Sequence, residues 1–461
     1  MFQPRATAAV DTVGLFSSEP LVAAAWDGRP IYKLAESVEE SEKQNQLIVT
    51  LRKDVRFHNG DVITAPVVRD LLKKKLGSYA PEVATIDALD DRRLVFTLHK
   101  PATRKPEDLS TLIVDSNDTP ELLALRTGPF RITSTNPVVL ERFDGYYQAA
   151  SAVQRLEIRQ YPTQRAAWTG MMLGEVNFLH EVNRDAIDFI EAGGDIKAYP
   201  LLRPYYTALV FNMRHPVLNR REVRVAINEA VDRNELVKNG MRGNGRVAEG
   251  PFWPYHWAYP HGRFPVSFNP EAAKLRLDGA GLPVVPGKAG QMPARFTFSC
   301  LVIANDDRFE RIALLVQRQL YFVGIEMRIV PVPASDILAR LVGGDFDAYL
   351  METGSGRILK WAHRFWHSPP PGSNQFVRTG YVAADAALDR LQIAHGDDAV
   401  REAVSDVMHV MRNDPPAAFL VWPREARAAD ASLDIPYEAD HDIFGTLWQL
   451  KRVTPDVEAR R

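Results

Sequence analysis

Short strand-like windows alternate with helix-like windows along nearly the whole chain of 461 residues. The strand-like windows are rich in Val, Ile, Phe, Tyr and Thr and are bounded by turn residues. The three longest helix-like windows place apolar residues at three- and four-residue spacing, with polar faces between them. This alternation predicts a mixed α/β fold. Strands are expected at 47–52, 93–100, 128–133, 155–161, 196–200, 207–213, 295–302, 326–332 and 347–352, and helices at 65–76, 165–176, 221–241, 306–324 and 398–414.

The composition is that of a globular protein, with 46% hydrophobic and 25% charged residues. At roughly 150 residues per domain, this length predicts two or three domains. The net charge is −2 and the basic residues are spread along the chain, so we expect no nucleic-acid partner. No window approaches 18 uncharged apolar residues, which predicts no membrane span. Residues 1–16 lack a basic segment followed by an apolar one, so no signal peptide is predicted within the chain.

Cysteine and histidine usage gives little sign of a metal or a cofactor. Cys300 is the single cysteine and lies in an apolar strand-like run, which favours a buried structural thiol over a reactive one. His363 and His367 are four residues apart and could share a helix face, but no third ligand is near them in the sequence. The sequence therefore predicts no metal site and no cofactor.

The segment His58–Asp61 raises the question of catalysis. It could be a polar catalytic cluster or a turn that ends the strand before it. Asn-Gly supplies a positive φ at low cost, Thr64 can cap the helix that follows, and Pro66 suits the first turn of that helix. We therefore predict a turn.

The run Glu352–Arg357 places Ser355 between two glycines. It lacks the Gly-x-Ser-x-Gly pattern of a nucleophile elbow and the Gly-Lys-Ser/Thr of a phosphate-binding loop. Two interpretations stay open, a backbone free to approach a ligand closely or a plain loop. With no assembled nucleophile, base and oxyanion donor in the chain, we predict that the protein is not an enzyme.

Aromatic residues gather in the proline-punctuated loop 250–265. Filling of the apolar core and lining of a ligand site are both open interpretations, because binding sites use aromatic faces for shape and Tyr and Trp polar ends for orientation. The five aromatic residues in eight positions are Phe252, Trp253, Tyr255, Trp257 and Tyr259.

Five stretches in a fixed order resemble one family, the extracytoplasmic solute-binding proteins of ABC transporters, in the oligopeptide/dipeptide/nickel-binding group called family 5. In the first, a strand ends in Phe-His-Asn-Gly and a helix follows. The second, Thr-Gly-Pro-Phe-Arg-Ile with Leu-Glu-Arg-Phe-Asp-Gly-Tyr-Tyr, is similar to the segment that re-enters the first lobe. The stretches are 33–72, 127–147, 156–178, 207–237 and 323–350, and the resemblance covers about Val13 to Leu450.

The resemblance implies a two-lobed α/β fold of the periplasmic-binding-protein, or Venus-flytrap, type, with an α+β subdomain inserted in the first lobe. It assigns lobe I to 1–31, 128–253 and 433–461, the inserted subdomain to 32–127, and lobe II to 254–432. It also implies that 12–27 and 446–450 share a lobe.

By the same resemblance, the chain is the periplasmic or otherwise extracytoplasmic solute-binding component of an ABC importer. It would capture a peptide-like or other small polar solute between its lobes and deliver it to the membrane subunits of a permease, as a monomer. The alternative is the ligand-sensing module of a regulatory protein, but no helix-turn-helix precedes Glu36. The family's first strand is missing from the N-terminal segment, so we expect that the chain begins late relative to the family.

The resemblance also implies positions for the solute site. Glu19 matches a glutamate of the family and could offer a carboxylate to the cleft. Peptide-binding members hold the peptide's amino group with an aspartate whose place falls near Gly356, but no aspartate lies between Asp347 and Asp385. The expected ligand-binding residues are Glu19, Tyr205, Tyr206, Trp253, Tyr255, Trp257, Glu352, Ser355, Arg357 and Trp361.

The charge of the segment Glu352–Arg378 favours a solute with an anionic or strongly accepting group. The segment has one acid, and its cations are Arg357, Lys360, Arg364 and Arg378. Lys360 and Arg364 are spaced as on a solvated helix face, whereas Arg357 follows the glycine loop and could form paired hydrogen bonds to a carboxylate or phosphate.

Overall fold

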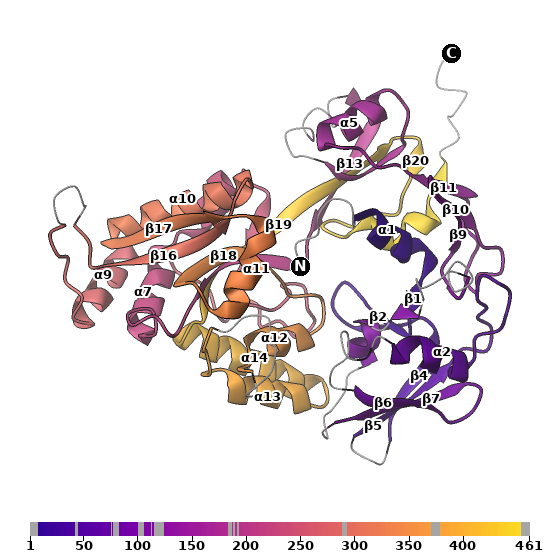
Figure 1. The fold of residues 1–461 in the computed structure, drawn as a ribbon, viewed down its shortest axis with the longest axis horizontal. Coiled ribbons are helices and arrows are strands. Elements are labelled where there is room, and N and C mark those ends of the chain that lie inside the picture. The colour runs from indigo at the N-terminus through magenta and orange to yellow at the C-terminus, as the bar shows by residue number, and fades with distance from the viewer. Residues whose placement is uncertain are drawn as a thin grey trace. The chain divides into compact units, whose positions relative to one another are not determined.

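The computed structural model describes two compact units, each with its own core (Figure 1). Unit 1 is Arg203–Arg424, and unit 2 is formed by the residues up to Leu202 together with those from Glu425 onward. These divisions differ from the lobe boundaries expected at 253/254 and 432/433. The described residues are 8–41, 45–74, 76, 83–99, 106–111, 113–114, 124–182, 187, 190, 193–287, 293–369 and 379–452, so Arg378 lies outside them.

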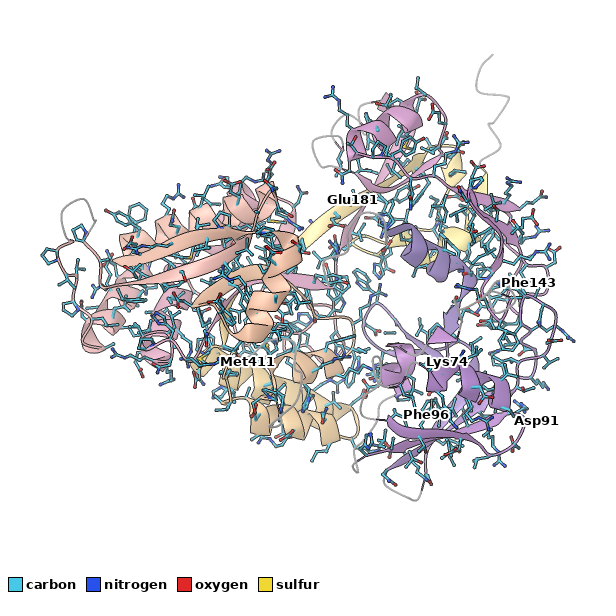
Figure 2. The ribbon with its side chains drawn as sticks, in the orientation of Figure 1. Lys74, Asp91, Phe96, Phe143, Glu181 and Met411 are labelled. Atoms are coloured by element: carbon cyan, nitrogen blue, oxygen red, sulfur yellow. The ribbon has the colours of Figure 1, made fainter. Side chains whose placement is uncertain are left out.

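Unit 2 contains an α+β region inside the range expected for the inserted subdomain. Its four antiparallel strands run in the order β4 (Ala35–Glu40), β5 (Gln46–Leu51), β7 (Arg93–Leu98), β6 (Val83–Ala88). In β5, apolar side chains alternate between buried and half-buried positions, the pattern of a strand with one face on a core. Phe96 is fully buried in this core (Figure 2).

Helix α2 (Ala65–Lys73) covers this region with an apolar face that includes Val68 and Leu72. Their four-residue spacing places them on one side of the helix. Pro66 lies in the first turn, as predicted. Thr64 occupies the N-cap position, but its side chain makes no capping hydrogen bond, so that part of the prediction was wrong.

The remainder of unit 2 joins the two ends of the described chain in one core. Phe16 of α1 (Ala8–Ser17) packs edge-on against Phe444, with ring centroids 5.9 Å apart. Segments 12–27 and 446–450 both belong to unit 2, which confirms the expectation that they share a lobe. The other elements of unit 2 are β1 (Glu19–Pro20), β2 (Val22–Ala24), β3 (Pro30–Tyr32), η1 (Pro106–Thr111), β8 (Ile113–Val114), β9 (Phe130–Thr135), β10 (Val138–Arg142), β11 (Arg155–Ile158), α5 (Gln164–Met172), β12 (Phe178–Val182), β13 (Ile196–Leu202), β20 (Leu433–Asp434), η3 (Ile443–Gly445), η4 (Leu447–Gln449) and β21 (Lys451–Arg452).

The segment His58–Asp61 is a turn, as predicted. The Asp61 carbonyl accepts from Phe57 N–H at 2.8 Å, and Gly60 has a φ of +94°. His58 itself is buried, which the sequence did not show. Its Nε2 lies 2.9 Å from the Gly128 carbonyl oxygen, and burial lowers its pKa to about 4.

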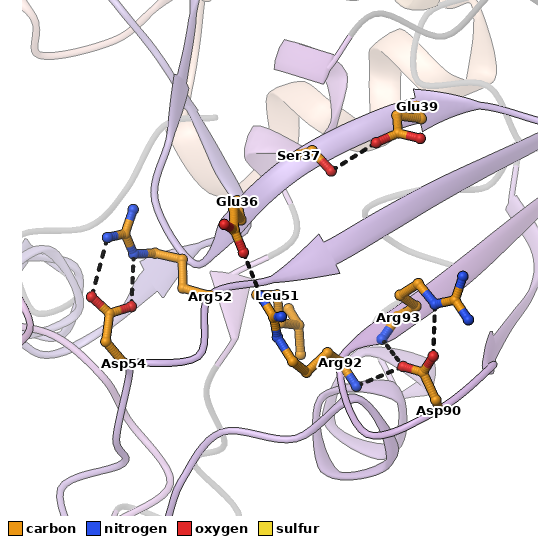
Figure 3. A network of polar contacts seen from close by, with 9 residues as sticks. All are labelled: Glu36, Ser37, Glu39, Leu51, Arg52, Asp54, Asp90, Arg92 and Arg93. Atoms are coloured by element: carbon orange, nitrogen blue, oxygen red, sulfur yellow. Dashed lines mark hydrogen bonds and ion pairs between the residues drawn. The ribbon is translucent and has the colours of Figure 1, made fainter.

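Arginines of the inserted region form hydrogen bonds and ion pairs with nearby backbone and carboxylate groups (Figure 3). Arg92 donates to the Leu51 carbonyl at 2.8 Å and pairs with Glu36, and Arg52 forms two bonds of 3.2 Å to Asp54. Exposed ion pairs of this kind contribute at most about 1 kcal/mol each. They fix local geometry more than they stabilise the fold.

Unit 1 is built on a mixed sheet in the order β19 (Ala417–Asp430), β14 (Tyr205–Phe211), β18 (Ala348–Gly354), β16 (Phe296–Ile303), β17 (Ile325–Val332). Strands β17 and β18 pair in parallel with β16, whereas β14 is antiparallel to both β18 and β19. Because β14 lies inside this sheet, the residues after Arg203 belong to unit 1. Its other elements are α7 (Arg221–Ala230), α8 (Arg233–Glu235), η2 (Leu236–Gly240), β15 (Gly245–Val247), α9 (Pro270–Gly279), α10 (Asp307–Phe322), α11 (Ala334–Gly343), α12 (Lys360–Trp366), α13 (Asp385–Ile393) and α14 (Asp397–Asn413).

Two expectations for unit 1 have clear outcomes. Cys300 is fully buried in β16, and burial raises the pKa of its thiol, which confirms a structural cysteine. The single helix expected at 221–241 is interrupted, because Val231 adopts an extended conformation. The Asp232 carboxylate then caps a new helical turn by accepting from the backbone N–H groups of Asn234 and Glu235.

Candidate functional site

The most polar arrangement around the predicted site residues lies where β14 begins and β18 ends. The two strands pair antiparallel, with Tyr205 opposite Gly354 and Thr207 opposite Glu352. Opposite residues of an antiparallel pair project from the same face of the sheet. Tyr205 and Glu352 therefore share a face, and we call the arrangement around them the Glu352 site, formed by Arg203, Tyr205, Arg308, Glu352 and the loop Gly354–Arg357.

The carboxylate of Glu352 is held between two arginines. Its Oε2 lies 3.7 Å from Arg203 Nη1, and its Oε1 lies 2.5 Å from Arg308 Nη1. The shorter contact lacks the alignment of a hydrogen bond, so the attraction is Coulombic. The Glu352 side chain is only 12% exposed, where charges interact more strongly than in water. Arg203 and Arg308 are the partners that sequence reasoning missed, since neither lies near Glu352 in the chain.

Arg203 and Arg308 are themselves positioned by neighbouring groups. The Arg203 guanidinium lies over the Tyr205 ring, 4.6 Å from its centroid. Arg308 lies in the first turn of α10, where its backbone N–H donates to the N-cap residue Asp306 at 3.0 Å. Its guanidinium also lies 3.9 Å from the Asp306 carboxylate. The two arginines thus lie at the start of an interior strand, β14, and at the start of a helix, α10, which are rigid supports for a site.

The loop Gly354–Arg357 is fastened at its backbone. The N–H groups of Ser355 and Gly356 both donate to the Pro204 carbonyl, at 3.0 and 3.1 Å, and Ser355 Oγ donates to the Pro251 carbonyl at 2.8 Å. These two N–H groups are therefore occupied within the chain, and both interpretations of the loop, close approach to a ligand and a plain loop, stay open. Gly356 has a φ of +60°, which an L side chain rarely adopts.

The predicted aromatic residues divide into buried and half-buried groups. Tyr206 and Trp253 are 1% and 2% exposed and pack against Trp422 in the core of unit 1, so their surroundings are those of core-filling residues. Tyr255 is half-buried beneath the Arg246 guanidinium, 5.2 Å from its ring centroid.

The two remaining tryptophans also lie under arginines. Trp257 is half-buried under Arg401 of α14, whose guanidinium lies 5.3 Å from its ring centroid. Trp361 is half-buried on α12, with Arg364 over its ring at 5.2 Å. A Cβ added at Gly356 would meet Trp361 Cδ1 at 2.4 Å, so the glycine loop and Trp361 are in close contact.

Glu19 lies in unit 2 and is buried. Its Oε1 accepts from the hydroxyls of Tyr146 and Tyr147, at 2.9 and 3.3 Å, and lies 3.8 Å from Lys33 Nζ. Burial raises the pKa of the Glu19 carboxyl, and Lys33 and the two hydroxyls lower it in part. The two tyrosines thus occupy Oε1, whereas Oε2 of the same carboxylate is buried without a hydrogen-bond partner among the described residues.

Among the described residues, one group has the side chains of a metal site. It consists of His363 of α12, His367 directly after that helix, and Asp389 of α13. Asp389 follows the histidines by more than 20 residues, which is why a search for local spacing did not find it.

Comparison with known proteins shows the family. The family of bacterial extracellular solute-binding proteins, family 5, matches residues 29–365, which is most of the chain. The oligopeptide-binding protein AppA of Bacillus subtilis is 24% identical over 450 residues, covering 89% of this chain and 82% of that protein. The nickel-binding periplasmic protein of Escherichia coli is 24% identical over 381 residues, covering 76% and 70%.

A solved structure shows the same fold at low identity. The crystal structure of a putative peptide-binding protein from Clostridium difficile matches with a TM-score of 0.82 and 17% identity, covering 98% of this chain and 99% of that one. The predicted two-lobed α/β fold class is confirmed. The chain belongs to family 5 of the bacterial extracellular solute-binding proteins.

The family fixes the class of activity. The chain is a solute-binding component of an ABC importer, as predicted, and its family is one of binding proteins whose members are extracytoplasmic. The matches give no support to the regulatory alternative. None of the helices in the described part of the chain is long and apolar enough to span a membrane.

Proposed function

We propose that this chain binds a small solute with an anionic or strongly accepting group at the Glu352 site, and passes it to an ABC permease without chemical change. We further propose that it acts as a monomer in an extracytoplasmic compartment and has no nucleic-acid partner. The supporting relatives include an oligopeptide-binding and a nickel-binding protein, so the family alone leaves the solute open.

The observation that carries the proposal is the state of the Glu352 carboxylate. Glu352 is the single acid of the expected ligand segment, and Arg203 and Arg308 already neutralise it. A peptide ammonium placed there would compete with two guanidiniums for one carboxylate and would be repelled by both. Since no aspartate lies between Asp347 and Asp385, the segment offers no second counterion for an amine.

The same charges favour an anion. Arg203 and Arg308 each carry a planar guanidinium fork with five N–H groups, a geometry that matches a carboxylate or a phosphate. Arg357 is half-buried directly after Ser355 and Gly356, whose hydrogen bonds hold the loop in place. A guanidinium on a fixed loop loses less conformational entropy when it binds a carboxylate or phosphate.

The test uses paired peptide probes and calorimetry. Each short peptide is made once with an acetylated N-terminus, which keeps only its carboxylate, and once with an amidated C-terminus, which keeps only its amine. For each peptide that binds, we expect the acetylated form to bind at least about 10-fold more tightly than the amidated form. The reason is that a charged hydrogen bond contributes about 1.5–3 kcal/mol. Tighter binding of the amidated members would overturn the proposal.

A pair of variants then places the binding site. Arg357→Ala should weaken binding of the best acetylated probe by about 10- to 150-fold, for the same loss of a charged hydrogen bond. The matched control is Arg340→Ala, which removes a half-buried arginine of α11 that pairs with Asp345 at 2.9 Å. A loss below twofold in Arg357→Ala, or an equal loss in both variants, would place the anion elsewhere.

A further inference from the structure

Two histidines of unit 1 stack on each other at the C-terminal end of α12, where His367 is the residue directly after the helix. His363 and His367 are four residues apart, which brings side chains together on an α-helix. Their ring centroids are 4.4 Å apart and the rings are inclined by 21°. Both side chains are mostly covered, with 21% and 23% of their surface exposed. Two like imidazoles this close repel each other if both are protonated.

A carboxylate from the next helix faces both rings. Asp389 lies on α13, and α12 and α13 pack side by side (Figure 1). Its Oδ1 lies 3.4 Å from His363 Nε2 and 3.1 Å from His367 Nε2. All three candidate ligand atoms lie within 4.8 Å of one another. The three groups therefore converge on one point.

The spacing matches that of ligands around a small dication. A tetrahedral zinc ion holds nitrogen and oxygen ligands at about 2.0–2.2 Å, which places neighbouring ligands about 3.3 Å apart. The two distances from Asp389 Oδ1, 3.4 and 3.1 Å, agree with that separation. Imidazole ligands suit the first-row divalent ions of zinc, copper, iron and nickel. A site with two imidazoles, one carboxylate and no thiolate therefore suits such an ion.

The tautomer of His367 is set by its second nitrogen. His367 Nδ1 lies 2.7 Å from the Ser368 carbonyl oxygen, which can only accept, so Nδ1 carries a proton. In the neutral ring, Nε2 then presents a lone pair toward Asp389. Ser368 is held in turn, since its backbone N–H donates to Asp385 at 2.9 Å. Metal-binding histidines usually have such an outer hydrogen bond.

A ring nitrogen and a carboxylate oxygen face each other in this cluster. A neutral imidazole is required of a metal ligand. His367 Nε2 and Asp389 Oδ1 lie 3.1 Å apart, and either a second ring proton or a metal ion can lie between them.

We propose that His363, His367 and Asp389 bind one divalent transition-metal ion, with zinc as the probe ion. Three protein ligands leave at least one coordination position for water or a small ligand. The residue Trp361, adjacent to the glycine loop, precedes His363 by two positions, or about 200° around the helix. The metal site therefore lies on the opposite face of α12 from Trp361 and is separate from the Glu352 site.

The experiment measures zinc binding to the full chain after treatment with a chelator, by equilibrium dialysis and calorimetry at pH 7.5. We expect one zinc ion per chain. His363→Gln and Asp389→Asn should each weaken zinc binding by at least about 10-fold. Loss of a hydrogen bond to a metal ligand already weakens binding by about that factor, and loss of the ligand itself should cost no less. His409→Gln, which removes an exposed histidine of α14, should bind zinc as the unaltered chain does.

The alternatives have distinct results. If His367 and Asp389 instead form an imidazolium–carboxylate pair, the unaltered chain binds zinc no more tightly than the variants do. That result overturns the proposal. Zinc bound equally by the unaltered chain, His363→Gln and Asp389→Asn is bound elsewhere, which also overturns it. Asp389 is exposed and Asn has nearly its shape, so Asp389→Asn preserves the fold, and a circular dichroism spectrum checks this. Substitution of Co²⁺ for zinc should give visible absorption bands that are lost in both variants.

Discussion

His58 makes unit 2 sensitive to acid, and the size of the effect follows from its environment. The ring is buried, its Nε2 is bonded to the Gly128 carbonyl at 2.9 Å, and Phe143 packs against it with ring centroids 4.9 Å apart. Burial disfavours the charged ring, and Arg126 and Arg131 add repulsion, so that the pKa falls from 6.5 to about 4 although the Gly128 bond opposes this. In the unfolded chain, His58 regains an ordinary pKa near 6.5.

The sign of the effect follows from proton binding. Between pH 6.5 and 4 the unfolded chain binds a proton at His58 and the folded chain does not, so stability decreases as the pH falls. Below pH 4 both states are protonated at this position and the loss is complete. Each pKa unit corresponds to about 1.4 kcal/mol, so the full loss is about 3 kcal/mol.

The substitution His58→Gln tests this directly. Glutamine keeps an N–H donor for the Gly128 carbonyl but does not titrate, so the variant should lose about 3 kcal/mol less than the unaltered chain between pH 6.5 and 4. The exposed His99 gives the control variant His99→Gln. Hydrogen exchange of peptides covering residues 55–63, measured at several pH values, reports the stability of this part of unit 2 without assuming two-state unfolding of both units.

The comparison isolates His58 from the other titrating groups. The buried Glu19 also titrates in acid, but it is common to all three proteins and cancels in the differences. Equal loss of protection in the unaltered chain and His58→Gln would show that His58 titrates normally and that the burial argument is wrong.

Two further substitutions test the packing of unit 1. Gly356→Ala should displace Trp361, because the new Cβ would lie 2.4 Å from Trp361 Cδ1. The φ of +60° at this position also costs an L residue about 1–2 kcal/mol. Tryptophan fluorescence should therefore change, whereas in the control Gly354→Ala the Cβ meets its nearest neighbour at 3.4 Å and the spectrum should stay the same. Arg233→Ala should lower the free energy of unfolding of unit 1 by about 3 kcal/mol or more in urea titrations, because the buried guanidinium donates to three carbonyl oxygens and one amide oxygen. Arg340→Ala removes one half-buried arginine that pairs with Asp345 and should cost at most about 1 kcal/mol. Equal effects of the two arginine substitutions would contradict the role assigned to Arg233.

Local chemistry was sufficient to predict the regular elements. The turn at His58–Asp61 followed from the Asn-Gly pair, and most strands followed from β-branched and aromatic runs. Strand β19 was missed, because Pro423 interrupts its apolar run and charged residues follow in the same strand. The break at Val231 was also missed, since the apolar spacing of a helix continues through it.

The candidate site was predictable in part. Its position at Glu352–Arg357 came from the family resemblance, and the excess of cations could be read from the sequence. The pairing of Glu352 with Arg308 and the approach of Asp389 to the two histidines at the end of α12 depend on packing between elements distant in the chain. No local pattern encodes such contacts, and the same holds for the bond between His58 and Gly128.

Native mass spectrometry of the full chain, incubated with a pooled mixture of small acidic, basic and neutral solutes, tests the central claim most directly. The account predicts one adduct per chain, formed by an anionic or strongly accepting solute, that is released unchanged on denaturation and is lost in Arg357→Ala. A chain that stays unliganded throughout, that selects cationic solutes without an accepting group, or that releases a chemically altered solute would contradict it.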